Sequence, residues 1–367
     1  MEHEFTSIII NIIKEYFPEI HEDVFEKSYL IRYLNFKTKS ASKGSKSRGS
    51  FANHYAIFVL VEDYINRGFL ENESAYSDYD GAIYTELFTR MRELPFGQKL
   101  QNHALNNRMN DEFKKFFPDV PHQPIIRDLK TKRYWINDNL LRIKVAGNFV
   151  NIANCIVEII NAYVAAKKSA FENFIEYSTK LSQLSGDDVQ KAIDFINQQI
   201  QPNIDARVFE IVSYAILKSH YSDTLLYWGW TPEELNEENL ILYKTGRTNA
   251  NDGGIDFVMK PLGRFFQVTE TLDFKKYFLD IDKIQRYPIT FVIKTESPED
   301  EIFEHLESSA HKMYGIKAFV KRYMESIEEV INIPKLNLIF SEQVNKNKVQ
   351  EIMEEIVVQS RVEFNYD

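Results

Sequence analysis

Helical and strand-like patterns of apolar residues alternate along the second half of the chain. Apolar residues recur at the spacing of helices with one buried face over residues 205–220, 273–286, 298–327 and 344–358. Short, nearly unbroken apolar runs, typical of buried strands, occupy residues 240–243, 255–259, 265–268, 288–294 and 336–340. This alternation predicts an α/β fold with three layers, in which a mixed central sheet lies between helices.

The first half of the chain carries mainly helical patterns. They span residues 1–26, 51–67, 82–94, 152–184 and 189–200. Pro202 and Asn203 then interrupt the pattern. We therefore expect a mostly helical region over residues 1–202 and a separate α/β domain over residues 203–367.

A short turn joins the two apolar runs at residues 255–259 and 265–268. The turn contains Pro261 and Gly263, and this composition predicts a β-hairpin. The two strands carry acidic and amide side chains near one end, so the hairpin is also where chemistry is expected.

The register of this hairpin decides which polar side chains meet. If Lys260 lies opposite Phe265, then Asp256 lies opposite Thr269. Side chains alternate between the two faces of a strand, so Asp256, Gln267 and Thr269 should share one face. Mg²⁺ prefers hard oxygen ligands, and these three side chains therefore suit a magnesium site.

Composition places the chain among soluble globular proteins. It has 367 residues, 44% of them hydrophobic and 27% charged. The single cysteine, Cys155, allows neither an intrachain disulfide nor a cysteine-built zinc site, which suits a reducing cytoplasm. The N-terminus lacks the pattern of a signal peptide, and no apolar run is long enough for a bilayer, so we expect no membrane partner.

The net charge of −10 argues mildly against nucleic acid, but the charges are unevenly distributed. No Asp or Glu occurs over residues 27–61, and residues 37–50 form a loop of Lys, Ser and Gly. Such a loop offers ammonium and hydroxyl donors to phosphates, although a solvated linker has the same composition.

Two later segments are also candidates for DNA contact. Residues 98–108 are rich in amide and basic side chains, which can pair with the edges of DNA bases. A polar loop that caps a helix would have the same composition. Residues 127–144 mix basic side chains with Tyr134 and Trp135, and these two rings could equally belong to the core. The expected DNA-binding residues are Lys37, Lys39, Lys43, Lys46, Arg48, Gln98, Lys99, Asn102, Asn106, Asn107, Arg108, Lys130, Lys132, Arg133, Arg247 and Asn249.

The hairpin and the helix before it resemble the core of PD-(D/E)xK nucleases, and among them type II restriction endonucleases. The segment Asp-Gly-Gly-Ile-Asp at residues 252–256 resembles the first element, with Asp256 as its metal-binding Asp. The segment Phe-Gln-Val-Thr-Glu at residues 266–270 resembles the second, with Gln267 in its (E/Q) position. Glu210 is similar to the Glu that the upstream helix of this family often supplies. The sequence departs from the family at Thr269, where a Lys is usual.

The resemblance implies a restriction-endonuclease-like core that cleaves double-stranded DNA with Mg²⁺, acting as a homodimer. Asp256 and Glu210 would contact the metal, and Gln267 and the Val268 carbonyl would add oxygen ligands. Either Glu270 takes a role in place of the missing Lys, or another Lys moves in. The available substitutes are Lys244, which is our first choice, Lys260 and Lys275.

Other interpretations stay open. The chain could be a modification-dependent or other phage-defence nuclease, or a DNA-binding protein on an inactive nuclease scaffold. Asp252 and its two glycines could form only a turn, and Glu210 could be a surface glutamate. The sequence has no phosphate-binding loop, so we expect no nucleotide cofactor. Its His residues lack the spacing of zinc ligands, so we expect no zinc site.

Overall fold

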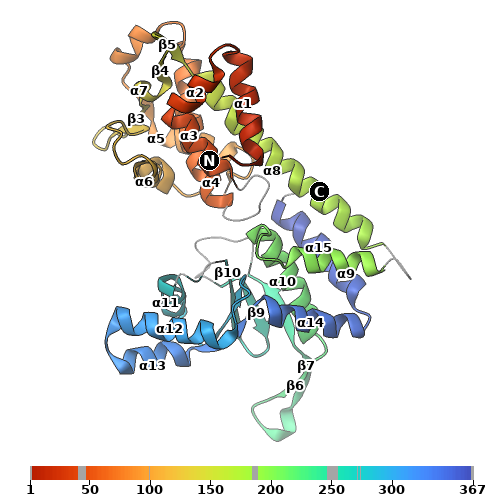
Figure 1. The fold of residues 1–367 in the computed structure, drawn as a ribbon. Helices are drawn as coiled ribbons and strands as arrows, with labels where there is room; N and C mark the ends of the chain where they lie inside the picture. Colours follow the sequence, from red (N-terminus) through yellow and green to blue (C-terminus); the bar gives the residue numbers. More distant parts are fainter. Residues whose placement is uncertain are drawn as a thin grey trace. The chain divides into compact units, whose positions relative to one another are not determined.

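The computed structural model describes residues 2–39, 47–98, 100–183, 189–245, 255–270, 272 and 274–364. The chain forms two compact units, Met1–Phe171 and Glu172–Asp367 (Figure 1). The division falls inside helix α8 (Ala153–Leu181), earlier than the functional boundary expected at residue 202. Helix α9 (Val189–Gln199) packs with helices of the second unit, which explains the difference. No helix of the described residues combines the length and the apolar character needed to cross a membrane.

The first unit is mostly helical, and its helices surround one hydrophobic core. They are α1 (Glu4–Tyr16), α2 (His21–Lys27), α3 (Tyr29–Thr38), α4 (Ser47–Asn66), α5 (Tyr84–Glu93), α6 (Met109–Phe116), α7 (Asp138–Leu141) and the first part of α8. Helix α4 is buried over residues 51–61, as its apolar pattern predicts.

Two small antiparallel sheets, which the apolar pattern did not predict, complete the first unit. One has the strand order β1 (Ala82–Ile83), β3 (Arg133–Ile136), β2 (Ile125–Asp128). The other is the hairpin of β4 (Arg142–Val145) and β5 (Asn148–Asn151). Each of these strands has only two to four residues, so any alternation, as in Arg-Ile-Lys-Val of β4, is too short to stand out from the sequence.

The second unit contains a mixed five-stranded sheet with the order β12-β11-β10-β9-β8. The strands are β8 (Ile241–Lys244), β9 (Phe257–Lys260), β10 (Arg264–Thr269), β11 (Ile289–Ile293) and β12 (Ile327–Ile331). Strand β9 is antiparallel to both neighbours, whereas β10, β11 and β12 are parallel. The prediction of an α/β fold with a mixed sheet is therefore confirmed.

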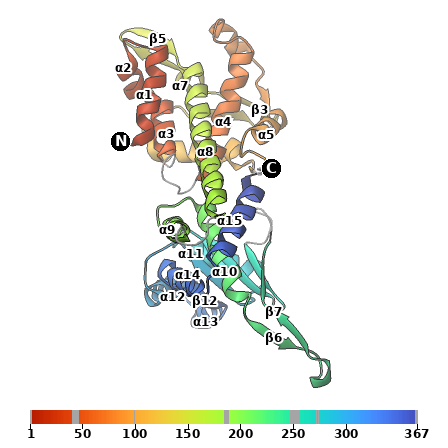
Figure 2. The same ribbon diagram turned by 90° about the vertical axis from the view of Figure 1, so that its right-hand side faces the viewer.

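Helices cover both faces of this sheet (Figures 1 and 2). On one face α10 (Ala206–Tyr221) packs through Tyr214 on Phe257 and through Tyr221 on Phe266. The helices α14 (Ile333–Asn345) and α15 (Val349–Phe364) pack against α10. A second core joins the other face to α11 (Phe274–Lys283), α12 (Glu299–Tyr314) and α13 (Lys317–Glu325). A separate two-stranded ribbon consists of β6 (Leu225–Trp228) and β7 (Asn236–Asn239).

The hairpin of β9 and β10 forms as predicted, but its register is shifted by two residues. Val258 and not Lys260 lies opposite Phe265. The N–H of Gly263 donates to the carbonyl of Met259 (2.8 Å), so the turn closes earlier than expected. A shift by two keeps every side chain on its expected face, because faces alternate with a period of two.

The prediction of a strand at residues 336–340 was wrong, because these residues lie in α14. The fifth strand is β12, at the end of a stretch that was expected to be helical. Leu336, Ile339 and Phe340 are buried, whereas Leu338 is 67% exposed, which is the spacing of a helix and not of a central strand. Asn332 starts the helix by accepting a hydrogen bond from the N–H of Lys335 (2.9 Å).

We expect Asn332→Ala to lower the free energy of unfolding by about 1 kcal/mol, because the start of α14 loses its side-chain cap. The side chain also donates to the carbonyl of Ser297 (2.8 Å), which ties the helix to the loop before α12. Urea unfolding followed by circular dichroism measures the change. Asn337→Ala, inside the same helix, is the matched control and should be nearly neutral. Equal effects of the two variants would contradict a capping role.

Candidate functional site

The polar residues of the hairpin gather where β9 begins. Asp256 directly precedes β9, and it is 7% exposed. Its N–H donates to the carbonyl of Phe266 (2.9 Å), and its carbonyl accepts from the N–H of Thr245 (3.0 Å). Asp256 is thereby held between β10 and the end of β8. Its carboxylate accepts a hydrogen bond from the N–H of Val268 (2.7 Å), which fixes the charge beside β10.

The amide of Gln267 lies next to that bond and is only half satisfied. Its Nε2 donates to the carbonyl of Val268 (3.1 Å), which determines how the amide is oriented. Its Oε1 is buried and has no hydrogen-bond partner among the described residues. An unpaired buried acceptor costs roughly 1–3 kcal/mol, so this oxygen is suited to a ligand that the protein itself does not supply.

Glu210 and Lys244 form a buried ion pair near the same end of the sheet. Asp205 caps the start of α10 by accepting from the N–H of Arg207 (2.9 Å), and Glu210 follows in the second turn. The Nζ of Lys244 lies 3.0 Å from Oε1 of Glu210, and each side chain is 9% exposed. The expected helical carboxylate is therefore buried, and it is balanced by the Lys that we chose first as a substitute.

A second buried lysine, which the sequence patterns did not single out, lies beside Thr269. Lys294 follows β11, and its N–H donates to the carbonyl of Thr269 (2.9 Å). Its Nζ donates to Glu270 (2.7 Å) and to the carbonyl of Ile204 (2.6 Å) at the start of α10. A Lys directly after a fully apolar strand was the signal that could have found it, because a charge there needs a partner.

The remaining two expected substitutes lie elsewhere. Lys260 is exposed at the far end of β9 and approaches the ring of Tyr243 (5.7 Å). Lys275 is an exposed residue of α11. Among the described residues, no contact links either lysine to the end of the sheet where Asp256 lies.

The expected ligands reach this end of the sheet from both faces. Lys244 pairs with Phe257, which packs on α10, so Lys244 and Glu210 lie on the α10 side. Gln267 pairs with Phe291, which packs on Tyr277 of α11 at 4.6 Å, so Gln267 lies on the α11 side. Asp256 directly precedes Phe257, so strand alternation places it with Gln267 on the α11 side, and its carboxylate accepts from the backbone N–H of Val268 in β10.

Thr269 is occupied by a contact within the protein. Burial raises the pKa of the Tyr277 hydroxyl above its usual range, and a hydrogen bond with Thr269 opposes this shift. Thr269 therefore binds α11, whereas the side chains of Asp256 and Gln267 both bond to the backbone of Val268. No three His, Cys, Asp or Glu side chains of the described residues form a metal-binding group. The expected metal site has only the carboxylates of Asp256 and Glu210 beside oxygen ligands of other kinds, so a group of three such side chains is not expected there.

Several expected DNA-binding residues of the first unit have partners inside the protein. Lys37 forms an ion pair with Glu112, and Arg133 donates to the carbonyl of Gly81 (2.9 Å). Asn106 accepts from the hydroxyl of Tyr134, which is buried, so that ring belongs to the core. The exposed candidates are Lys39, Gln98, Asn102, Asn107, Arg108, Lys130 and Lys132. The candidates Lys43, Lys46, Lys99, Arg247, Asn249 and the side chain of Arg48 lie outside the described residues.

Comparison with known proteins adds no assignment to this geometry. No protein-family model, no curated protein and no solved structure matches the chain. The groups at this site that can carry chemistry are the buried carboxylates, amide and lysines at the end of the five-stranded sheet.

Proposed function

We propose that this protein is an endonuclease that hydrolyses phosphodiester bonds of double-stranded DNA with Mg²⁺. The observation that carries the proposal is the buried Oε1 of Gln267, which lacks a donor, beside the carboxylate of Asp256. Apart from the β6–β7 ribbon inserted after α10, the order α10-β8-β9-β10-α11-β11 is the one that the resemblance to PD-(D/E)xK nucleases requires, and it supports a restriction-endonuclease-like core. The substrate, the cytoplasmic location and a homodimer that cuts both strands belong to the same proposal.

Asp256 and Gln267 would hold the cation through a carboxylate and an amide oxygen, which are hard ligands. A bound divalent metal supplies an activated water and relieves charge on the phosphate. The carbonyl of Val268 already accepts from Gln267, so it is the weaker of the proposed ligands. Glu210 would have to exchange its contact with Lys244 for a metal-bound water or a second cation.

The chain supplies buried positive charge for the phosphate from Lys244 and Lys294. Each ammonium is now balanced by a carboxylate, from Glu210 and Glu270 respectively. Lys294 directly follows β11 and bonds to the backbone of Thr269, the position from which the usual Lys is missing. Glu270, the last residue of the second motif, would then position Lys294 through their ion pair.

Incubation of the purified protein with phage DNA and Mg²⁺ tests the proposal, with EDTA as the control. Discrete fragments are the expected result for a restriction enzyme. Cutting of methylated DNA alone would favour a modification-dependent nuclease. A gel shift without cutting would favour a DNA-binding protein on an inactive scaffold, and the contact between Thr269 and Tyr277 makes this the second candidate function. No cutting and no shift with either DNA would reject all three.

Substitution of Gln267 should change metal affinity in opposite directions. Gln267→Glu adds a negative charge and should tighten Mg²⁺ binding, whereas Gln267→Met removes the oxygen and should weaken it, each by roughly tenfold. Isothermal titration without DNA measures both. Gln350→Met, at an exposed position of α15, is the control. Unchanged affinity in both Gln267 variants would remove this amide from the metal site.

A further inference from the structure

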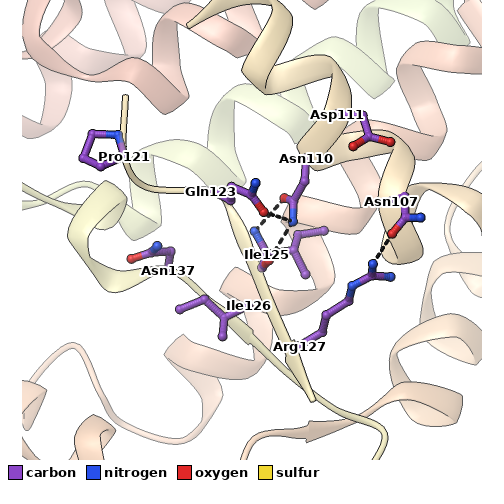
Figure 3. Close-up of a pocket in the computed structure, with 9 residues that line it drawn as sticks. All are labelled: Asn107, Asn110, Asp111, Pro121, Gln123, Ile125, Ile126, Arg127 and Asn137. Atoms are coloured by element: carbon purple, nitrogen blue, oxygen red, sulfur yellow. Dashed lines mark hydrogen bonds between the residues drawn. The ribbon is translucent and has the colours of Figure 1, made fainter. Parts of the chain in front are cut away.

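A polar pocket in the first unit is separate from the proposed nuclease site. It lies between β2 and the helical stretch formed by the π-helix Ala104–Arg108 and α6, and Figure 3 shows the side chains that line it. Its volume is about 410 Å³. Pockets for small ligands range over roughly 300–1,000 Å³, so this one suits a single nucleobase or a nucleotide better than a larger molecule.

The pocket wall is held in place by one buried amide. Asn110 of α6 accepts from the N–H of Ile125 (3.0 Å) and donates to the carbonyl of the same residue (2.8 Å). These two bonds join α6 to the start of β2. The neighbouring side chains on both elements are therefore presented at a fixed separation.

The pocket contains one negative and one positive group that are not paired with each other. The carboxylate of Asp111 has no hydrogen bond or ion pair among the described residues, although it lines the pocket. The guanidinium of Arg127 bonds to the amide oxygen of Asn107 and to Tyr134, and forms no ion pair with the described carboxylates (Figure 3). The two charges cancel, so the pocket favours a neutral ligand with both donors and acceptors over a phosphate.

The amides of the pocket add donors. The oxygen of Asn137 is used by the N–H of Asn139 (3.2 Å), and the oxygen of Gln123 is used by Asn110 (3.2 Å). Each therefore has its NH₂ group left for a ligand. Ile126, which is 46% exposed, and Pro121 supply apolar surface against which a flat ring can lie.

We propose that this pocket binds a guanine base that is not stacked in a duplex. Of the four DNA bases, only guanine offers two adjacent acceptors, O6 and N7, which Arg binds as a pair. On its Watson–Crick edge, which adjoins the first at O6, it offers two adjacent N–H donors, from N1 and N2, which a carboxylate accepts. Arg127 and Asp111 are therefore matched to the two edges of one ring. A base inside a duplex cannot reach such a pocket, so the source is an extruded or single-stranded nucleotide, or a free one.

The inference gives the proposed nuclease a way to read its substrate, but its test does not depend on cleavage. Binding is measured in EDTA by fluorescence anisotropy with a labelled duplex that carries one bulged guanine. Duplexes with a bulged adenine, a bulged cytosine or no bulge are the comparisons, and GMP is the competitor. We expect the bulged guanine to bind most tightly. Tighter binding of GMP than of the bulged guanine, seen as complete displacement of the labelled duplex by GMP at a lower concentration than unlabelled duplex needs, would identify a free nucleotide as the source.

Asp111→Asn should reduce the preference for guanine over adenine by roughly tenfold to a hundredfold, which is the range for one lost bidentate contact. Asp119→Asn, an exposed acid just after α6 and outside the pocket, should leave the preference unchanged. Both positions are exposed, and a thermal melt checks that the variants fold. Equal affinity for all bulged bases, or an unchanged preference in Asp111→Asn, would overturn the proposal. Base preference without any DNA cleavage would leave this pocket standing while the nuclease proposal fails.

Discussion

Asp256→Asn should reduce Mg²⁺-dependent DNA cleavage on the order of a thousandfold, because a metal stabilises charge in the transition state by several kcal/mol. The change is chosen to spare the fold. An Asn oxygen can still accept the hydrogen bond from the N–H of Val268 that now reaches the Asp256 carboxylate at 2.7 Å. The strand contact is thus kept while the negative charge is removed.

The measurement is the rate of plasmid cleavage at saturating DNA, together with a gel shift in Ca²⁺ and a thermal melt. Asp300→Asn, on the exposed face of α12, is the matched control and should cut like the parent protein. Cleavage by Asp256→Asn within about tenfold of the parent would reject Asp256 as a ligand, since even groups that only support a ligand contribute about that much. Loss of both cleavage and folding would point to a structural carboxylate instead.

The elements of the second unit could largely be predicted from the sequence because they follow simple periodicities. Strand β11 is a run of buried residues, and α10 repeats its apolar positions at helical spacing. The prediction that Gln267 and Thr269 share a face stayed correct although the register was wrong, because an error of two residues leaves the alternation of faces unchanged. The prediction of a strand at residues 336–340 failed because a short apolar run fits a helix and a strand equally. The cap at Asn332 is the local signal that favours the helix.

The pairing of buried charges could not be predicted in the same way. Lys294 contacts Glu270 and the carbonyl of Ile204 because β11 pairs with β10 and the end of β11 reaches the residues before α10. No spacing of residues in the sequence predicts that these three residues are in contact. The resemblance identified where a lysine was missing, but only the sheet order shows which lysine stands on the adjacent strand.

Lys244→Met should lower the free energy of unfolding by about 3–5 kcal/mol, because it leaves the buried carboxylate of Glu210 without its partner. The Nζ of Lys244 lies 3.0 Å from Glu210, and both side chains are 9% exposed, so water cannot replace the lost contact. Lys321→Met breaks a surface pair with Glu325 at 3.6 Å, with side chains 76% and 60% exposed, and should change stability little. Urea unfolding of the three proteins measures the difference.

The double variant Lys244→Met/Glu210→Gln separates stability from chemistry. Removing both charges should restore most of the stability, because a neutral buried pair has no unbalanced charge to desolvate. Cleavage should stay low if Glu210 or Lys244 takes part in the reaction. Full cleavage by the restored double variant would make this pair structural, and it would leave Lys294 as the buried cation beside the proposed metal site. A double variant as unstable as Lys244→Met alone would show instead that the loss comes from packing of the lysine side chain and not from its charge.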